Sequence, residues 1–158
     1  MTKVAINGFG RIGRMAFRAM RDNHPGLEVV AINDLTDSKT LNHLLKYDSI
    51  YGRYAKSIGP EVKMLSEKDP ADLPWKKLGV DVVLECSGVF TEIEDARKHL
   101  AAGAKKVIIS STSKSDGVPT FVLGVNEKTF DKAKHKVINN ASCTTNCTAP
   151  VVKVLHDA

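Results

Sequence analysis

A glycine-rich turn between a strand and a helix constrains this fold more than any other feature of the sequence. The apolar segment Lys3–Asn7 leads into Gly8-Phe9-Gly10-Arg11-Ile12-Gly13, which has the spacing Gly-x-Gly-x-x-Gly. A helical pattern follows, and a second apolar segment, Leu27–Ile32, ends at Asn33-Asp34. The glycine pattern alone is weak evidence, but strand, glycine turn, helix, strand and acid in this order are typical of dinucleotide-binding folds.

Each part of this turn has a mechanical reason. Gly8 permits the tight turn, Gly10 lets the backbone approach a pyrophosphate, and Gly13 lets the helix pack close to the strand. The helix N-terminus then faces the phosphates. Asp34 lies 21 residues beyond Gly13, where a carboxylate can accept a hydrogen bond from the adenosine ribose. Because this acid would repel a 2′-phosphate, we expect the cofactor to be NAD in preference to NADP.

The rest of the chain alternates helices and strands. We expect the first helix to bury Ile12, Met15, Ala16 and Ala19–Met20, and further helices over Ser38–Tyr47, capped by Ser38, and from Thr91 to about Ala102. Further strands are expected at Val62–Leu65, Asp81–Cys86, Val107–Ile109, Thr120–Val125 and Lys136–Asn139. Because the apolar strands lack an alternation of polar and apolar residues, we expect an α/β fold with a Rossmann-type, doubly wound, mainly parallel sheet.

In such a sheet, ligands bind at the carboxyl ends of the strands. The residues expected to converge there are Asn7–Gly10, Asp34, Ser87–Gly88, Ser110 and Cys143.

The segment Asn140–Cys147 predicts a nucleophilic thiol. It reads Asn-Ala-Ser-Cys-Thr-Thr-Asn-Cys and precedes a helical pattern. Pro150 leaves two placements, a helix that begins near Thr148 or one that begins near Cys143 and kinks at Pro150. In either case Cys143 lies near the positive end of a helix dipole, which favours the thiolate. A buried structural cysteine in a capping loop is the alternative interpretation, and Cys147 is expected to be a small core residue.

The composition of the chain narrows the classes of protein to which it can belong. The 158 residues suffice for one ordinary domain with a sizeable core. No apolar run reaches the roughly 20 residues that span a bilayer, and we expect no signal peptide. Three cysteines, an odd number, fit a reducing cytoplasm. The net charge of +5 suits anionic ligands, but the basic residues are scattered, so we expect no nucleic-acid partner, no membrane partner and no metal site.

Taken together, the motifs resemble phosphorylating glyceraldehyde-3-phosphate dehydrogenase. The resemblance is carried by Asn7-Gly8-Phe9-Gly10-Arg11-Ile12-Gly13-Arg14 and Ala141-Ser142-Cys143-Thr144-Thr145-Asn146-Cys147, and it extends through residues 44–49 and 103–110 over essentially the whole chain. It implies an NAD-binding Rossmann domain over residues 1–142. Residues 143–158 would form a helix that bears the nucleophile and begins a catalytic domain absent from this sequence.

The resemblance also implies roles for individual residues. Arg11 and Ile12 would contact the pyrophosphate through the turn, and Asp34 the adenosine ribose. Lys68 stands where the family usually has an arginine beside the adenine. The groove would be lined by Ser87, Gly88 and Ser110. Cys143 would be the nucleophile, and the groups that touch substrate or inorganic phosphate would be Ser142 and Thr144.

In the family, the thiolate attacks an aldehyde, hydride passes to the nicotinamide, and phosphate releases an acyl phosphate from the thioester, a glycolytic reaction. The stretch from Gly52 to Met64 is shorter than usual by about one β-hairpin. None of the five histidines, His24, His43, His99, His135 and His156, matches the family's base. We therefore expect this chain alone to bind NAD with little or no turnover.

Several interpretations remain open beside an N-terminal dehydrogenase portion. The chain could be half of a two-chain enzyme, an erythrose-4-phosphate dehydrogenase, or a non-enzymatic module that binds NAD, RNA or another protein. A phosphorylated aldehyde would be a partner only if the missing domain were supplied. Because in the family a terminal helix from beyond that domain returns to cover one sheet face, we also expect self-association.

Overall fold

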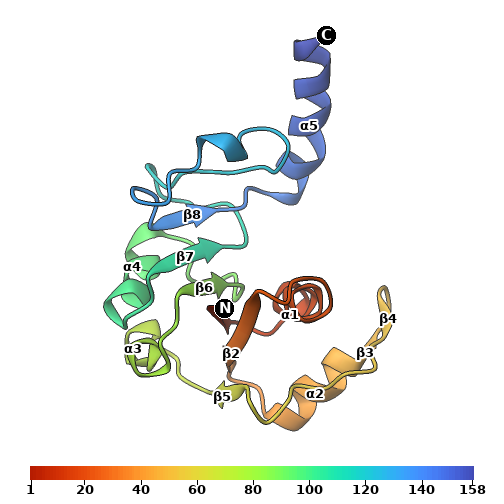
Figure 1. The fold of residues 1–158 in the computed structure, drawn as a ribbon, viewed down its shortest axis with the longest axis vertical. Helices are drawn as coiled ribbons and strands as arrows, with labels where there is room; N and C mark the ends of the chain where they lie inside the picture. The colour runs from red at the N-terminus through yellow and green to blue at the C-terminus, as the bar shows by residue number, and fades with distance from the viewer.

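The computed structural model describes all 158 residues and is built around a six-stranded sheet (Figure 1). Its strands are β1 (Thr2–Asn7), β2 (Leu27–Asn33), β5 (Lys63–Leu65), β6 (Val82–Glu85), β7 (Lys106–Ile109) and β8 (Val137–Asn139). They lie in the order β5-β2-β1-β6-β7-β8, and every neighbouring pair is parallel. Strand order reverses between β1 and β6, which confirms the doubly wound α/β fold and places the topological switch point there.

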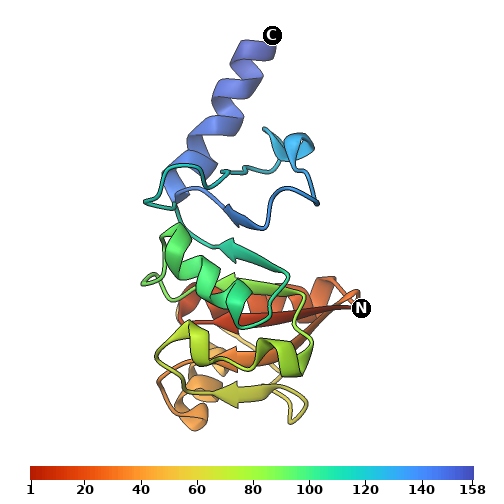
Figure 2. The ribbon, with the colours of Figure 1, turned by 90° about the vertical axis from the view of Figure 1, so that its left-hand side faces the viewer.

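Helices cover the two faces of this sheet (Figures 1 and 2). On one face, α1 (Arg11–Asn23) and α2 (Ser38–Lys46) close a core of 11 buried residues that includes Ile6, Phe17 and Leu45. On the other, α3 (Trp75–Leu78) and α4 (Ile93–Ala101) close a core of 12 buried residues around Trp75 and Val83. Burying such apolar side chains contributes roughly 1.5–3 kcal/mol each, which is what holds the layers together.

Smaller elements fill the connections between these helices and strands. A short antiparallel hairpin, β3 (Tyr47–Asp48) with β4 (Gly52–Arg53), follows α2. Single turns of 3₁₀ helix occur at η1 (Pro70–Asp72) and η2 (Glu127–Thr129). No helix combines the length and the apolar character that crossing a bilayer requires.

The face of α1 that packs on the sheet differs from the predicted one. Gly13, Phe17 and Met20 are buried, whereas Ile12 is 58% exposed and Ala19 is exposed. Phe17 sets this orientation, because its ring packs edge-on against Phe9 with centroids 5.6 Å apart. The predicted stripe is therefore wrong at Ile12 and Ala19, whereas Met20 is buried and Ala16 packs, partly buried, against the same core.

Two predicted helix caps and one predicted strand are also wrong. The cap of α2 is Asp37, whose carboxylate accepts from the Thr40 N–H at 3.0 Å, and Ser38 is the first helical residue. At the start of α4 the Ile93 N–H donates to the Ser115 hydroxyl instead of to Thr91.

The segment Thr120–Val125 is not a strand, because it makes only one bridge, from Thr120 to Asn139. The Asn126 side chain holds this segment as a loop, since it accepts from the Val122 N–H and donates to the Thr120 carbonyl.

The far half of the sheet is less well covered on one face than on the other. Along β6, β7 and β8, buried residues alternate with half-buried ones. Val83 and Val107 pack on the α4 side, whereas Leu84, Ile108 and Ile138 point to the opposite face and are only partly buried. On that face Leu84 packs against the core beneath α1. Because the residues are apolar on both faces, the alternation follows from the sparser covering of this face and not from residue type.

The last helix, α5 (Cys143–Asp157), projects away from the sheet (Figures 1 and 2). It begins at Cys143 with Pro150 inside it, which selects the earlier of the two predicted starts. None of its residues is buried, and the most exposed apolar side chains are Val151, Val152, Val154 and Leu155. Cys147 is exposed, so the prediction that it is a core residue is wrong.

Candidate cofactor site and nucleophile

A cleft of about 430 Å³ opens at the carboxyl ends of β1, β2 and β6, beside the switch point. Six residues singled out from the sequence line it: Asn7, Gly8, Gly10, Asp34, Lys68 and Ser87. The other predicted cofactor residues, which do not line it, are Arg11, Ile12, Gly13, Gly88 and Ser110. The cleft is thus assembled from three strand ends that are far apart in the sequence.

The glycines of the turn serve different purposes. Gly8 has φ +88°, and a Cβ there would lie 2.5 Å from the backbone N and Cα of Ser87. A Cβ on Gly13 would collide with the carbonyl oxygen of Gly8, so this glycine brings α1 close to the turn. No heavy atom lies within 4 Å of the position that a Cβ on Gly10 would occupy. The first two glycines are required by packing, whereas Gly10 leaves the cleft side of the turn open.

The start of α1 is suited to an anion. Its N-cap is Gly10, which offers no side chain, and its first turn contains no acidic residue. The backbone N–H groups of the first turn therefore have no side-chain acceptor and point out of the helix end. This is the arrangement by which helix N-termini bind phosphate groups. Arg11 and Ile12 are exposed here, as the first two helical residues.

Asp34 connects the glycine turn to the end of β2. One carboxylate oxygen accepts from the Phe9 N–H at 2.7 Å, and the other accepts from the Thr36 N–H at 2.9 Å. Each carboxylate oxygen can accept more than one hydrogen bond. The side chain is thereby held in one orientation while it retains acceptor capacity for a ribose hydroxyl.

Several residues of the cleft wall were not predicted from the sequence. They are Asn33, Leu35, Glu67, Cys86, Val89 and Phe90. A usable signal existed for Asn33, because β2 ends in Asn, an unusual residue for the last position of an apolar strand. The position of Cys86 immediately after β6 offered a similar signal.

Cys143 is the first residue of α5 and its side chain is exposed, which rules out the alternative of a buried structural cysteine. The cap beside it is well formed, since the Ser142 hydroxyl accepts from the Thr145 N–H at 3.0 Å and lies 2.9 Å from the Thr144 hydroxyl. The Asn146 side chain donates to the carbonyl oxygens of Asn140 at 2.7 Å and Ser142 at 2.9 Å. These polar contacts fix the loop that carries the thiol.

The residue two places before Cys143 is backbone-strained. Ala141 has φ +60°, the only positive φ at a non-glycine residue. It is buried, and its N–H donates to the Asn139 side chain at 2.9 Å. Such strain costs of order 1–3 kcal/mol and persists only where the surroundings hold it. Ala141 and Asn139 are therefore part of the support for the thiol, which sequence reasoning missed.

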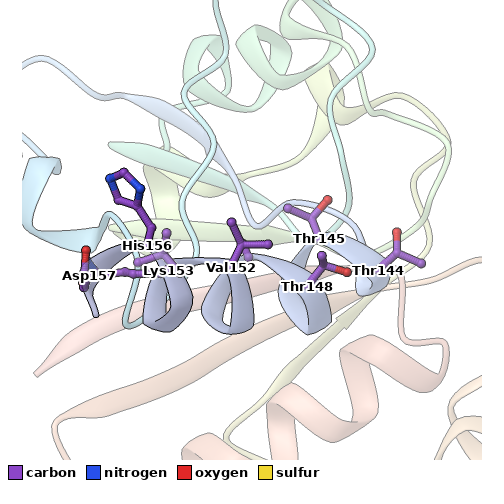
Figure 3. Close-up of a pocket in the computed structure, with 9 residues that line it drawn as sticks. Thr144, Thr145, Thr148, Val152, Lys153, His156 and Asp157 are labelled. Atoms are coloured by element: carbon purple, nitrogen blue, oxygen red, sulfur yellow. The ribbon is translucent and has the colours of Figure 1, made fainter.

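A second cleft, of about 660 Å³, runs along α5 (Figure 3). It extends from Thr144 and Thr145 at the start of the helix to His156 and Asp157 at its end. Of the predicted site residues it contains only Thr144, and it includes none of the residues around Asp34. The chain thus forms one cleft beside the glycine turn and a separate groove along α5.

No histidine lies beside the Cys143 thiol. His99 is fully buried and bonded to Glu85, and His135 packs against Phe121 and Phe130. His156 follows Cys143 by 13 residues in the same helix, which is about 20 Å along the axis. None of these three histidines is therefore placed to act as a base toward the Cys143 thiol.

The three cysteines should differ sharply in alkylation by iodoacetamide. Burial raises the pKa of the Cys86 thiol to about 11, so its thiolate at neutral pH is roughly 300-fold scarcer than that of a free cysteine of pKa about 8.5. Because thiolates of high pKa are more nucleophilic, we expect Cys86 to react roughly 20-fold or more slowly than the exposed Cys143. Its rate should rise about tenfold per pH unit until pH approaches 11.

Peptide mapping of the time course would measure all three rates. Cys147 is the internal control, since it is equally exposed but one turn further from the helix N-terminus. Equal rates at Cys143 and Cys147 would contradict the helix-dipole argument, and a fast Cys86 would contradict its burial.

Comparison with known proteins identifies the family. The profile described as "Glyceraldehyde 3-phosphate dehydrogenase, NAD binding domain" matches residues 2–93. The chain is 54% identical to the glyceraldehyde-3-phosphate dehydrogenase of Geobacillus stearothermophilus over 165 aligned positions, which cover 98% of this chain and 49% of that protein. Its likeness to the enzyme of Clostridium pasteurianum is 56% over 167 positions, covering 99% and 49%.

The chain therefore spans about half the length of the curated relatives it matches, and each alignment is longer than its own 158 residues. The relatives thus carry aligned residues with no counterpart here. The match, the doubly wound sheet and the cleft beside the glycine turn agree with one another: the chain belongs to the glyceraldehyde 3-phosphate dehydrogenase family, of which it is an NAD-binding domain of the Rossmann type.

Proposed function

We propose that this chain is the cofactor-binding and nucleophile-bearing part of a phosphorylating glyceraldehyde-3-phosphate dehydrogenase. NAD lies in the cleft, with its pyrophosphate at the N-terminus of α1 and its adenosine ribose on Asp34. The observation that carries this proposal is the hydrogen bond from the Phe9 N–H to the Asp34 carboxylate. It joins the expected phosphate site and the expected ribose site into one rigid unit.

The residues present fit such a ligand. The open side of Gly10 leaves room for a pyrophosphate, and the uncapped N–H groups of α1 supply donors for it. NAD supplies the acceptor for hydride. The roles of this chain are to hold the dinucleotide and to present the Cys143 sulfur at the start of α5, where the thiolate can form a covalent bond with an aldehyde carbon.

Calorimetric titration of the 158-residue chain tests the proposal directly. We expect NAD to bind with a single site per chain and NADP to bind more weakly under the same salt conditions, because the Asp34 carboxylate repels a 2′-phosphate. A chain that is folded by circular dichroism and takes up no NAD would overturn it.

Asp34→Ala should weaken NAD binding by roughly 1–3 kcal/mol, the usual value for a lost hydrogen bond to a charged group. The substitution also removes the acceptor for the Phe9 N–H, so the loss should fall at the upper end of that range. Asp37→Ala is the matched control, since Asp37 caps α2 and lies outside the cleft. It should lower stability slightly and leave the NAD dissociation constant unchanged. If the two variants bind NAD equally well, Asp34 has been misassigned.

We also propose that the chain associates with itself. The half-buried Leu84, Ile108 and Ile138 and the exposed apolar residues of α5 support this proposal. Apolar patches of this kind mark interaction surfaces. Analytical ultracentrifugation should show concentration-dependent association, and a monomer at all concentrations would contradict it. The three free cysteines, two of them exposed, favour the cytoplasm as its compartment.

A further inference from the structure

A buried carboxylate lies directly behind the cofactor cleft. Glu85, the last residue of β6, is 1% exposed, and His99 of α4 is fully buried. The His99 Nε2 lies 2.9 Å from the Glu85 carboxylate, and the Trp75 indole N–H donates to His99 Nδ1 at 3.0 Å. None of these three residues lines the cleft. An acid buried this deeply is costly unless its oxygens are fully hydrogen-bonded.

The two oxygens of Glu85 together accept four hydrogen bonds. One accepts from the Ser87 N–H at 2.8 Å and from the Ser87 hydroxyl. The other accepts from the Asn7 side-chain amide and from His99 Nε2. Ser87 and Asn7 both line the cleft, so three of the four donors that satisfy Glu85 belong at the same time to the wall of the cleft.

The directions of the hydrogen bonds that His99 and Asn7 make to Glu85 are fixed from outside. The Trp75 indole can only donate, so His99 Nδ1 must accept and Nε2 carries the proton that points at Glu85. From the other side, the Glu67 N–H can only donate, and it donates to the Asn33 side-chain oxygen at 2.8 Å.

The Asn33 amide nitrogen must therefore donate, which it does to the Asn7 side-chain oxygen at 2.7 Å. This leaves the Asn7 amide nitrogen as a donor toward Glu85. Both routes converge on the same oxygen of Glu85, which must therefore accept from His99 and from Asn7.

This network also joins the three strand ends that form the cleft. Asn7, Asn33 and Glu85 are the last residues of β1, β2 and β6. We propose that Glu85 is a positioning residue for the dinucleotide: its carboxylate fixes the turn at Ser87 and the amide of Asn7, and so sets the shape of the cleft. The proposal rests on the proposed function, because it assumes that this cleft binds NAD.

Glu85→Gln is the direct test. Gln is nearly isosteric, but its amide nitrogen must face either the Ser87 N–H or the N–H groups of Asn7 and His99, so two donors always oppose each other. We expect the NAD dissociation constant from calorimetry to rise roughly tenfold or more. The indole N–H signal of Trp75, the only tryptophan, should move upfield in the ¹H–¹⁵N spectrum, because His99 loses its charged partner and accepts more weakly. The Ser87 amide signal should shift as well.

Asn126→Asp is the matched control. Asn126 is half-buried, lies outside the cleft, accepts from the Val122 N–H at 2.8 Å and donates to the Thr120 carbonyl at 2.9 Å. The exchange of amide for carboxylate is the reverse of the test and creates a similar mismatch outside the cleft. It should lower the melting temperature while the NAD dissociation constant stays within about twofold and the Trp75 signal stays in place.

The outcomes separate a positioning role from a purely structural one. Glu85→Gln binding NAD as tightly as the wild type, or both variants losing affinity equally, would overturn the proposal. If Glu85→Gln does not fold, His99→Phe serves instead, because it removes only one of the donors to Glu85. A loss of NAD affinity of roughly threefold in this variant would support the proposal. An NAD affinity unchanged from wild type would overturn it. If the wild type itself binds no NAD, the proposed function fails. In that case unmoved Ser87 and Trp75 signals in Glu85→Gln would independently refute the network.

Discussion

Gly8→Ala is expected to remove most of the stability of this chain and to abolish the cofactor cleft. The residue has φ +88°, a conformation that alanine adopts only with strain, and the new Cβ would lie 2.5 Å from backbone atoms of Ser87. Backbone atoms at the end of β6 cannot move aside as a flexible side chain could. Relief therefore requires β1 and β6 to separate, and we expect a loss of about 3 kcal/mol or more. Urea unfolding followed by circular dichroism would measure it.

Gly10→Ala provides the contrast within the same turn. Its φ is −69°, and no heavy atom lies within 4 Å of the new Cβ. The free energy of unfolding should change by no more than about 1 kcal/mol. NAD binding should nevertheless weaken, since the methyl group occupies the open side of the turn that the pyrophosphate approaches. A Gly8→Ala protein as stable as the wild type, or a Gly10→Ala protein with undiminished NAD affinity, would contradict these assignments.

The second large effect concerns turnover. Given NAD, glyceraldehyde 3-phosphate and inorganic phosphate, the 158-residue chain assayed by itself should form NADH at a negligible rate. Its Cys143 thiol has no base in reach, and a general base typically contributes about 10²–10⁴ in rate. The deficit relative to a complete enzyme should therefore be at least about 100-fold. NADH absorbance follows the reaction.

Cys143→Ser is the control for that assay. Slow NADH formation that persists in this variant would come from a contaminant, whereas a rapid rate that the substitution abolishes would refute the expectation. Adding a separate chain that carries the remaining half of a relative tests the two-chain hypothesis, because activity would then appear only in the mixture. Replacing the substrate with erythrose 4-phosphate in the same mixture tests the alternative aldehyde.

The sheet and the cofactor turn were predictable because their determinants are local. The glycines, the apolar strands and Asp34 follow one another within a single strand–helix–strand unit, so their spacing carries the geometry. The errors in the cap of α2 and in the buried face of α1 arose where two neighbouring residues fit the same sequence pattern equally well. Asp37 and Ser38 are both good helix caps, and a helical face displaced by one position has nearly the same apolar content.

The Glu85 network could not be predicted in this way. An acid at the end of an apolar strand ordinarily indicates the first solvent-exposed position. Glu85 is buried only because donors from β1, α4 and the following turn meet it, and those segments are brought together by the complete sheet. Similarly, Thr120–Val125 has the composition of a strand but lies where a single asparagine side chain satisfies its backbone.

The isolation of α5 has a consequence for reactivity. Because none of its side chains is buried, α5 is held against fraying by its own backbone hydrogen bonds and by its N-terminal cap. Helices of about 15 residues are marginal in water, and Pro150 removes one more bond. The sulfur at the first residue of α5 keeps its electrostatic setting only while that turn stays wound. A surface that docks against Val151–Leu155 would therefore stabilise the first turn of α5 and with it the electrostatic setting of the thiol. Assembly would then raise the nucleophilicity of Cys143.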